Sequence, residues 1–177
     1  MIRLLLINLL AFVFSIAQAA DNPAAELFTT INLRLSYMQE VALYKAQQQL
    51  PIEDIPREQL VIVDAKIAAA ELGLNPESME DFFAAQIAVA KAIQYRYREQ
   101  LLSEPSQPPA QDLDSEIRPV LTQLGDRIVQ LIAGQILTSG PLGATDWNAF
   151  DAAIDTNFVS PADKRLLFDA LILVRAR

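Results

Sequence analysis

Signals for the starts of helices recur along this chain and restrict it to a fold built from helices. Three of them place a helix-capping residue directly before a proline, at Asn22-Pro23, Asn75-Pro76 and Ser160-Pro161. Asn and Ser side chains accept a hydrogen bond from a free N–H at a helix start, and proline is favoured in the first turn. The intervening segments are rich in Ala, Leu, Gln and Glu, with 5 glycines in the whole chain. The sequence therefore predicts an all-α fold.

About six helices are expected, arranged as a bundle. They cover approximately residues 23–49, 54–72, 76–102, 114–137, 147–157 and 161–174. The first ends at Leu50-Pro51, because the residue before a proline is disfavoured in the helical region. Residues 104–112, EPSQPPAQD, interrupt any helix and could mark a domain boundary. Because only about 65 residues follow them, we interpret 20–177 as a single domain, with a catalytic three-helix half (20–103), a proline-rich connection (104–112) and a C-terminal helical half (113–177).

The first 19 residues have the pattern of a secretory signal peptide. Arg3 precedes an apolar run over residues 4–16, and Ala17-Gln18-Ala19 follows as a cleavage site. We expect cleavage after Ala19 and export, most simply to a bacterial periplasm. The alternative is an uncleaved membrane anchor, but a run of 13 residues is short for a span that needs about 20.

Charge and composition exclude several classes of function. Removal of Arg3 leaves 13 basic against 22 acidic residues, a net charge of −9. Such a surface repels nucleic acid and anionic lipid, so we expect no nucleic-acid partner and no membrane contact after cleavage. The chain has no His and no Cys, which excludes Ser-His-Asp and Cys-His nucleophiles and imidazole or thiolate metal sites. A metal site made of carboxylates alone has no supporting motif.

Cationic side chains nevertheless border the apolar stripes of the predicted helices. Arg34 and Lys45 lie eleven residues apart, about three turns at ~3.6 residues per turn, so both project from one side of the first helix. Asp54, Arg57 and Glu58 follow at i, i+3 and i+4 and share a face at the start of the second helix.

Two further polar residues lie beside buried stripes later in the chain, Gln94 on the third helix and Arg127 on the fourth. Taken singly, each charged residue has a structural alternative, as a solvated side chain or in an internal salt bridge such as Lys45 with Glu53. Taken together, several inward-facing cations would repel one another unless an anion lay between them. We therefore expect a pocket for a small dianion, which Arg can bind in a bidentate way.

Two segments resemble the helical chorismate mutases. The first joins Arg34 and Lys45 to residues 50–58, LPIEDIPRE, and the second is residues 82–95, FFAAQIAVAKAIQY, which resembles the third-helix signature FFxxQIxxxKxIQ. The signal peptide and the additional half after the proline-rich connection resemble the secreted subclass. The match is densest over residues 31–97, and outside this range Arg127 is the one residue that we assign to the family's site.

The resemblance implies the rearrangement of chorismate to prephenate, a unimolecular pericyclic step. Such a step needs no nucleophile, no acid-base pair, no metal and no cofactor. It needs a cage for the folded diaxial conformer and positive charge at the ether oxygen whose bond breaks.

The resemblance also implies seven site residues: Arg34, Lys45, Asp54, Arg57, Glu58, Gln94 and Arg127. Arg34 and Arg127 would bind carboxylates, and Arg57 would support the same end of the site. Lys45 would contact the ether oxygen and a carboxylate, and the Gln94 amide would donate to that oxygen. Asp54 and Glu58 would hold the ring hydroxyl region.

One residue departs from the pattern, because Ala90 stands where the family commonly has Ser or Thr. The missing hydroxyl predicts a raised KM rather than a lost kcat. We expect the pocket to be completed within one chain, and the chain to form a homodimer. Two alternatives stay open: a non-catalytic periplasmic binding or interaction module, and a pyruvate lyase acting on isochorismate.

Overall fold

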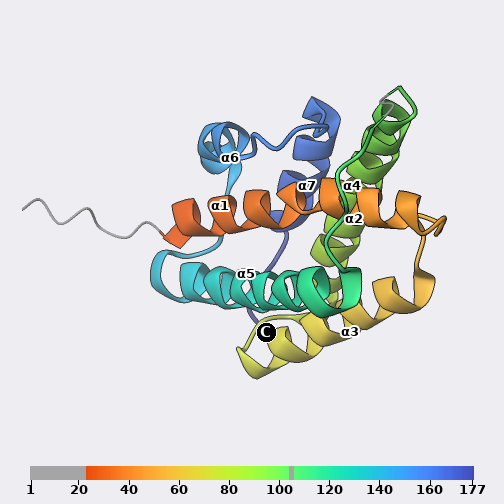
Figure 1. Ribbon diagram of the computed structural model, residues 1–177. Helices are drawn as coiled ribbons and strands as arrows, with labels where there is room; N and C mark the ends of the chain where they lie inside the picture. Colours follow the sequence, from red (N-terminus) through yellow and green to blue (C-terminus); the bar gives the residue numbers. More distant parts are fainter. Residues whose placement is uncertain (1–22, 104–105) are drawn as a thin grey trace, which may run out of the picture.

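The chain folds into a bundle of helices (Figure 1). The structure, a computed structural model, describes residues 23–103 and 106–177. The main helices in these ranges are α1 (Pro23–Ser36), α2 (Met38–Gln47), α3 (Ile55–Glu71), α4 (Pro76–Leu101), α5 (Arg118–Ser139), α6 (Trp147–Ala153) and α7 (Pro161–Leu171). A π-helical turn, η1 (Leu113–Ile117), precedes α5, and a 3-10 turn, η2 (Ala144–Asp146), precedes α6. The predicted all-α fold is confirmed, whereas the predicted signal peptide and its cleavage site lie outside the described residues.

Side-chain caps fix the starts of several helices where the sequence predicted them. Asn75 Oδ1 accepts a hydrogen bond from the backbone N–H of Ser78 at 2.9 Å, at the start of α4. At the start of α7, Ser160 and Asp163 each accept a hydrogen bond from the other's backbone N–H. These bonds satisfy N–H groups that the helix itself leaves unpaired.

The first predicted helix is two consecutive helices in the structure. Tyr37 separates α1 from α2 while keeping a helical backbone, with φ −67° and ψ −13°. The two helices therefore form one nearly straight rod (Figure 1). Arg34 lies in the last turn of α1 and Lys45 in the last turn of α2, so the rod carries both predicted cations.

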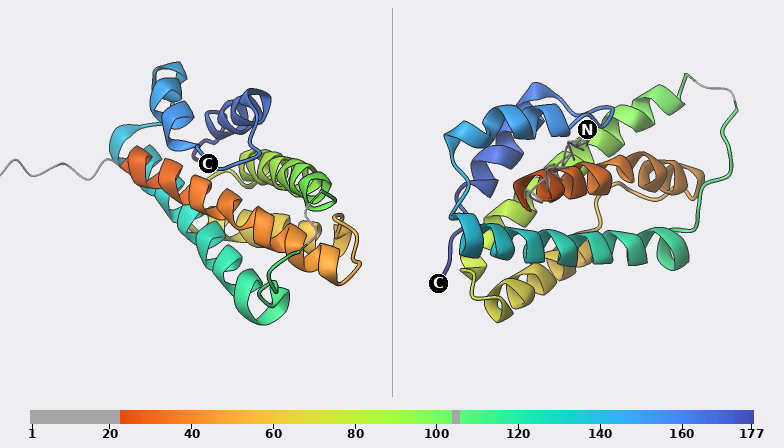
Figure 2. Two further views of the ribbon diagram at one scale, coloured as in Figure 1. Left: turned by 45° about the horizontal axis from the view of Figure 1, so that its top comes forward. Right: turned by 90° about the vertical axis from the view of Figure 1, so that its left-hand side faces the viewer.

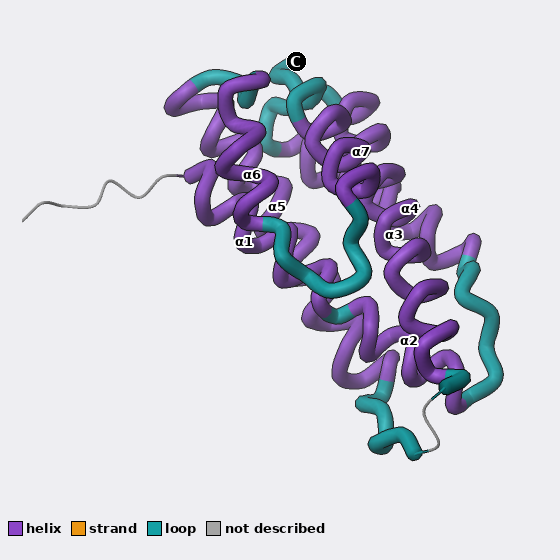
Figure 3. The backbone as a smooth tube through the Cα atoms, turned by 90° about the horizontal axis from the view of Figure 1, so that it is seen from above, coloured by secondary structure: helices purple, strands orange, loops and turns teal. Residues whose placement is uncertain are grey.

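The rod packs against different helices along its two parts. α1 lies beside α5 and α6, whereas α2 lies beside α4, and α3 packs against both α4 and α5 (Figures 1 and 2). α7 covers a further side of α4. Viewed from above, the described chain consists of helices and loops (Figure 3). This arrangement brings α2, α3, α4 and α5 together around one region.

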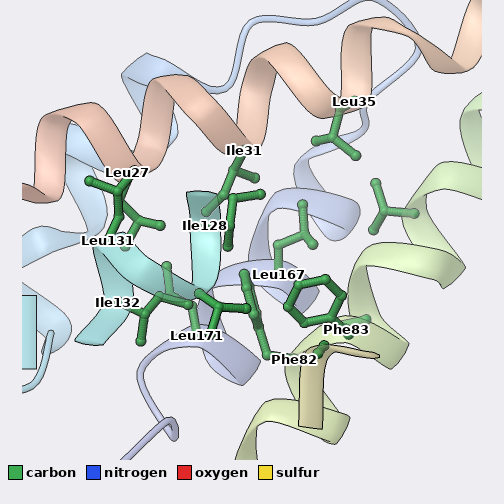
Figure 4. Packing of buried hydrophobic residues seen from close by; sticks show 14 of the residues in the cluster. Leu27, Ile31, Leu35, Phe82, Phe83, Ile128, Leu131, Ile132, Leu167 and Leu171 are labelled. Carbon is green, nitrogen blue, oxygen red and sulfur yellow. The ribbon is translucent and has the colours of Figure 1, made fainter. Parts of the chain in front are cut away.

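A single hydrophobic core joins the two halves of the chain. Figure 4 shows core side chains contributed by α1, α4, α5 and α7: Leu27, Ile31, Leu35, Phe82, Phe83, Ile128, Leu131, Ile132, Leu167 and Leu171. Burying each such side chain stabilises the fold by about 1.5–3 kcal/mol. Because residues from before and after the connection share this core, the described residues form one domain.

The connection between the halves is held against α2. The Gln47 amide donates to the carbonyl of Pro108 at 2.7 Å and accepts from the N–H of Ala110 at 3.2 Å. The N–H of Gln111 donates to Glu40 Oε1 at 2.8 Å. These bonds fix where α5 begins relative to α2, at the end of the rod that carries Lys45.

None of the helices in the described ranges combines the length and apolar character that a membrane span requires.

Candidate active site

A pocket lies between α2, α3, α4 and α5, with a cavity volume of about 130 Å³. Residues from before and after the proline-rich connection both line it. The predicted site residues that line it are Arg34, Lys45, Asp54, Arg57, Glu58 and Gln94. The structure brings these six side chains together, although they come from four helices and one loop.

Arg34 is a buried cation, with 6% of the residue exposed. Its Nη1 donates to Gln86 Oε1 on α4 at 3.4 Å, and its Nε has no hydrogen-bond partner. Burial, together with the positive charge of Arg57, lowers the pKa of Arg34 to about 10. A guanidinium in this state has strong unused capacity to bind an anion.

Lys45 is also buried, with 7% of the residue exposed. Its ammonium donates to the backbone carbonyl of Ile52, in the loop before α3. Burial lowers the pKa of Lys45, and the negative charge of Asp54 opposes that shift. An ammonium has three donors, so the bond to Ile52 fixes the group and leaves donors for a ligand.

Gln94 lies within α4 with 5% of the residue exposed. Its Nε2 donates to the carbonyl of Ala90 at 3.2 Å and contacts the sulfur of Met38 at 3.7 Å. Its Oε1 is buried without a partner. The sulfur is a weak acceptor, so one amide N–H remains available to a stronger acceptor in the pocket.

Four carboxylates line the pocket, Asp54, Glu58, Asp64 and Asp126, and the first two are each held in an ion pair. Asp54 caps α3 by accepting from the N–H of Arg57 at 3.3 Å, and its Oδ2 pairs with Arg118 Nη2 at 2.7 Å. Glu58 accepts from the N–H of Asp54 at 3.2 Å, and its Oε2 pairs with Lys91 Nζ at 2.9 Å. These pairs balance two of the pocket's cations and orient both carboxylates.

Three cations at the pocket have no such balance. Within the described ranges, no carboxylate forms an ion pair with Arg34, Lys45 or Arg57. Arg57 instead donates to Thr122 Oγ1 on α5 at 3.1 Å. These three cations therefore remain available to an anionic ligand, although the carboxylates of Asp64 and Asp126 also line the pocket.

The structure does not place Arg127, which the sequence predicted for this site, in the pocket. Arg127 points away from the pocket and pairs with Glu26 on α1 at 2.5 Å, with side chains 48% and 51% exposed. Its neighbour Asp126 lines the pocket instead. Consecutive helical residues point about 100° apart, so the predicted rotation of this helix was wrong by about one residue.

Arg118 is the arginine of α5 that lines the pocket. The pocket face of α5 recurs at three- and four-residue steps: Arg118, Leu121, Thr122, Gly125, Asp126 and Val129. Arg118 begins this face, directly after the connection held by α2. The helical spacing of these residues is visible in the sequence, but the larger apolar residues elsewhere on α5 indicated a different inner face. Lys91 was also missed, although it lies within the signature segment.

Comparisons with known proteins match this chain to chorismate mutases over most of its length. Residues 17–95 match the family described as chorismate mutase type II. The chain is 40% identical over 150 residues to the secreted chorismate mutase of Yersinia pestis, covering 83% of this chain and 79% of that protein. It is 38% identical over 146 residues to the monofunctional chorismate mutase of Enterobacter agglomerans, covering 82% and 80%.

This chain belongs to the type II chorismate mutase family. The crystal structure of the Yersinia pestis secreted enzyme matches it with a TM-score of 0.80 and 39% identity, covering 86% of this chain and 98% of that one. The Burkholderia thailandensis chorismate mutase structure matches with a TM-score of 0.68 and 26% identity, covering 85% and 98%. The resemblance to the secreted subclass is thereby confirmed, and it extends beyond residue 95 into the half that carries Arg118.

Ala90 is the departure from the family pattern that the sequence indicated. It lines the pocket on the same face of α4 as Gln94, one turn earlier. Its methyl group contributes no hydrogen bond where Ser or Thr would, so the pocket has one donor fewer for a carboxylate.

Proposed function

We propose that this chain is a chorismate mutase, which rearranges chorismate to prephenate in the pocket between α2, α3, α4 and α5. The observation that supports this most is the set of three cations without carboxylate partners, Arg34, Lys45 and Arg57, beside the amide of Gln94. Chorismate carries two carboxylates and one ether oxygen whose bond breaks. The pocket therefore offers cationic groups without ion-pair partners to the carboxylates of this substrate, and a neutral donor for its ether oxygen.

The arginines bind the two carboxylates and select the folded conformer. Arg34 and Arg57 receive one carboxylate, because their charges lie close enough for Arg57 to lower the pKa of Arg34. Arg118 receives the other, in the role first predicted for Arg127. Holding both ends of the molecule removes the conformational freedom that slows the uncatalysed reaction.

Lys45 and Gln94 act on the ether oxygen as it gains electron density. The ammonium supplies a charged donor that the carbonyl of Ile52 holds in place. The amide supplies a neutral donor from α4. Both donate throughout the physiological pH range, so the site needs no proton on a carboxylic acid.

Asp54 and Glu58 hold the ring hydroxyl region. Both are already oriented by ion pairs, with Arg118 and Lys91 respectively. A carboxylate whose second oxygen is engaged still accepts a hydroxyl hydrogen bond. Arg118 therefore links the hydroxyl end of the pocket to a carboxylate end.

These effects are large enough for the reaction. A rate enhancement of about a million-fold corresponds to roughly 8 kcal/mol. Preorganised donors at a developing oxyanion contribute about 3–4 kcal/mol each, and conformer restriction supplies the remainder. The proposal accordingly assigns no part of the rate to a metal or cofactor.

The direct test is loss of chorismate absorbance with prephenate formation by purified residues 20–177, at neutral pH without added metal. Lys45→Met should reduce turnover by orders of magnitude, while the circular dichroism spectrum remains that of a helical protein. Wild-type protein that leaves chorismate unchanged would overturn the proposal. Release of pyruvate from isochorismate would instead identify the lyase activity.

We further propose that the chain is exported to the periplasm, with residues 1–19 removed after Ala19. The apolar run and the Ala17-Gln18-Ala19 end support this, as does the relative from Yersinia pestis that is named a secreted chorismate mutase. Mass spectrometry of the protein recovered from a periplasmic extract should give a chain that begins at Ala20.

We also propose a homodimer. α3 carries Leu60, Val63 and Ile67 at three- and four-residue spacing, and these side chains are 47%, 50% and 54% exposed. Such a contiguous apolar row is typical of protein contacts. Val63→Lys should reduce the mass measured by light scattering to that of one chain; a wild-type mass of one chain would contradict the proposal.

A further inference from the structure

A buried amide on α4 holds the guanidinium of Arg34. Gln86 lies eight residues before Gln94 and is fully buried, with 0% of the residue exposed. Gln86 is not a pocket-lining residue, so it has no direct access to a substrate. Its side chain points toward α1, where its Oε1 accepts from Arg34 Nη1 at 3.4 Å.

The bonding of this pair is incomplete on both sides. Arg34 Nε and Gln86 Nε2 are both buried without a hydrogen-bond partner. Among the described residues no carboxylate pairs with Arg34. A fold optimised for stability alone would favour a carboxylate at position 86, because a buried cation without a counter-ion is costly.

A carboxylate would, however, neutralise the charge that the pocket needs. Glu has the shape of Gln and would reach Arg34 from the same place on α4. The resulting ion pair would compete with any anionic ligand for the guanidinium. A neutral acceptor orients the group and leaves its charge uncompensated.

We propose that Gln86 is a positioning residue, which orients Arg34 through one neutral hydrogen bond and keeps its charge available to a substrate carboxylate. This inference rests on the proposed function of the pocket. The amide at position 86 forms no ion pair with Arg34, so the ligand supplies the counter-charge. Gln86 acts through Arg34 and touches no reacting atom.

The test compares Gln86→Glu with Gln86→Met, each assayed for chorismate turnover and thermal unfolding. Gln86→Glu should lower kcat/KM by about tenfold or more, mainly by raising KM, because it removes an uncompensated charge. Its Tm should equal or exceed that of wild type. Gln86→Met removes the acceptor but keeps the charge, so it should lose less activity than Gln86→Glu.

A merely structural role predicts the opposite order, because Glu retains the acceptor that Met lacks. Gln86→Glu that is more active than Gln86→Met, or that unfolds at a lower Tm than wild type, would overturn the inference. In an Arg34→Met background, Gln86→Met should change kcat/KM by less than about twofold if the two residues act as a unit. Wild-type protein without turnover would instead overturn the proposed function, and this inference with it.

Discussion

Arg118 and Arg127 provide a matched test of the pocket, because both lie on α5 and only the first of the two lines it. Arg118 pairs with Asp54 at 2.7 Å and also with Asp114, and its side chain is 30% exposed. Arg127 pairs with Glu26 in a more exposed position. Replacing each by Ala removes the same side chain from the same helix, so the two variants differ in position and in the partner that each leaves unpaired.

The expected magnitude follows from these contacts. A hydrogen bond to a charged group contributes about 1.5–3 kcal/mol, and partial exposure of Arg118 favours the lower part of that range. Arg118→Ala should therefore reduce kcat/KM roughly 10- to 30-fold. Arg127→Ala breaks a surface ion pair that contributes about 0–1 kcal/mol to stability, and it should leave kcat/KM within about twofold of wild type.

The assay must separate loss of Arg118 from exposure of the charge on Asp54. Arg118→Ala leaves that carboxylate without its partner, and it would then repel an anionic substrate. Asp54→Asn removes the charge but retains an oxygen that caps α3. In the Asp54→Asn background, Arg118→Ala should still reduce kcat/KM several-fold, measured by loss of chorismate absorbance.

Two results would refute this reasoning. Equal losses for Arg118→Ala and Arg127→Ala would mean that position on α5 does not matter. Disappearance of the Arg118→Ala effect in the Asp54→Asn background would mean that Arg118 only masks a charge and binds no carboxylate.

Further predictions concern pH, affinity and stability. Burial lowers the pKa values of Lys45 and Arg34. A stopped-flow pH profile of kcat/KM should therefore be flat from about pH 5 to about pH 8 and fall in alkali as these donors lose protons. A rate that increases as the pH falls below neutral would contradict this. Ala90→Ser should lower KM severalfold with kcat nearly unchanged, and a large change in kcat would show that the hydroxyl acts in catalysis. Ser160→Ala removes an acceptor from the N–H of Asp163 and should lower the free energy of unfolding by about 1 kcal/mol in urea titration, without altering turnover; an unchanged midpoint would show that the cap is dispensable.

The starts of helices and the common direction of Arg34 and Lys45 were predictable from the sequence for local reasons. Caps and prolines act within one turn, so Asn75 and Ser160 fix the starts of α4 and α7 regardless of the remaining chain. Arg34 and Lys45 share a rod whose apolar stripe is unambiguous, so their common direction followed from spacing.

The rotation of α5 was not predictable in the same way. Its last turns bury Ile128, Val129, Leu131 and Ile132, which point in several directions because α5 packs between α1 and α3. With apolar residues around most of the helix, the stripe does not define one inner face. The choice between Arg118 and Arg127 therefore depends on tertiary packing, which the spacing of a single segment does not contain.

In the proposed binding mode, Lys45 and Gln94 face one ether oxygen while arginines hold the two carboxylates. The most direct measurement is a crystal structure of residues 20–177 with a bicyclic mimic of the transition state. We predict that the ether oxygen of the mimic lies within hydrogen-bond distance of Lys45 Nζ and Gln94 Nε2, with its carboxylates on Arg34 and Arg118. A mimic bound elsewhere, or bound in this pocket without contact to Lys45 and Gln94, would contradict the account.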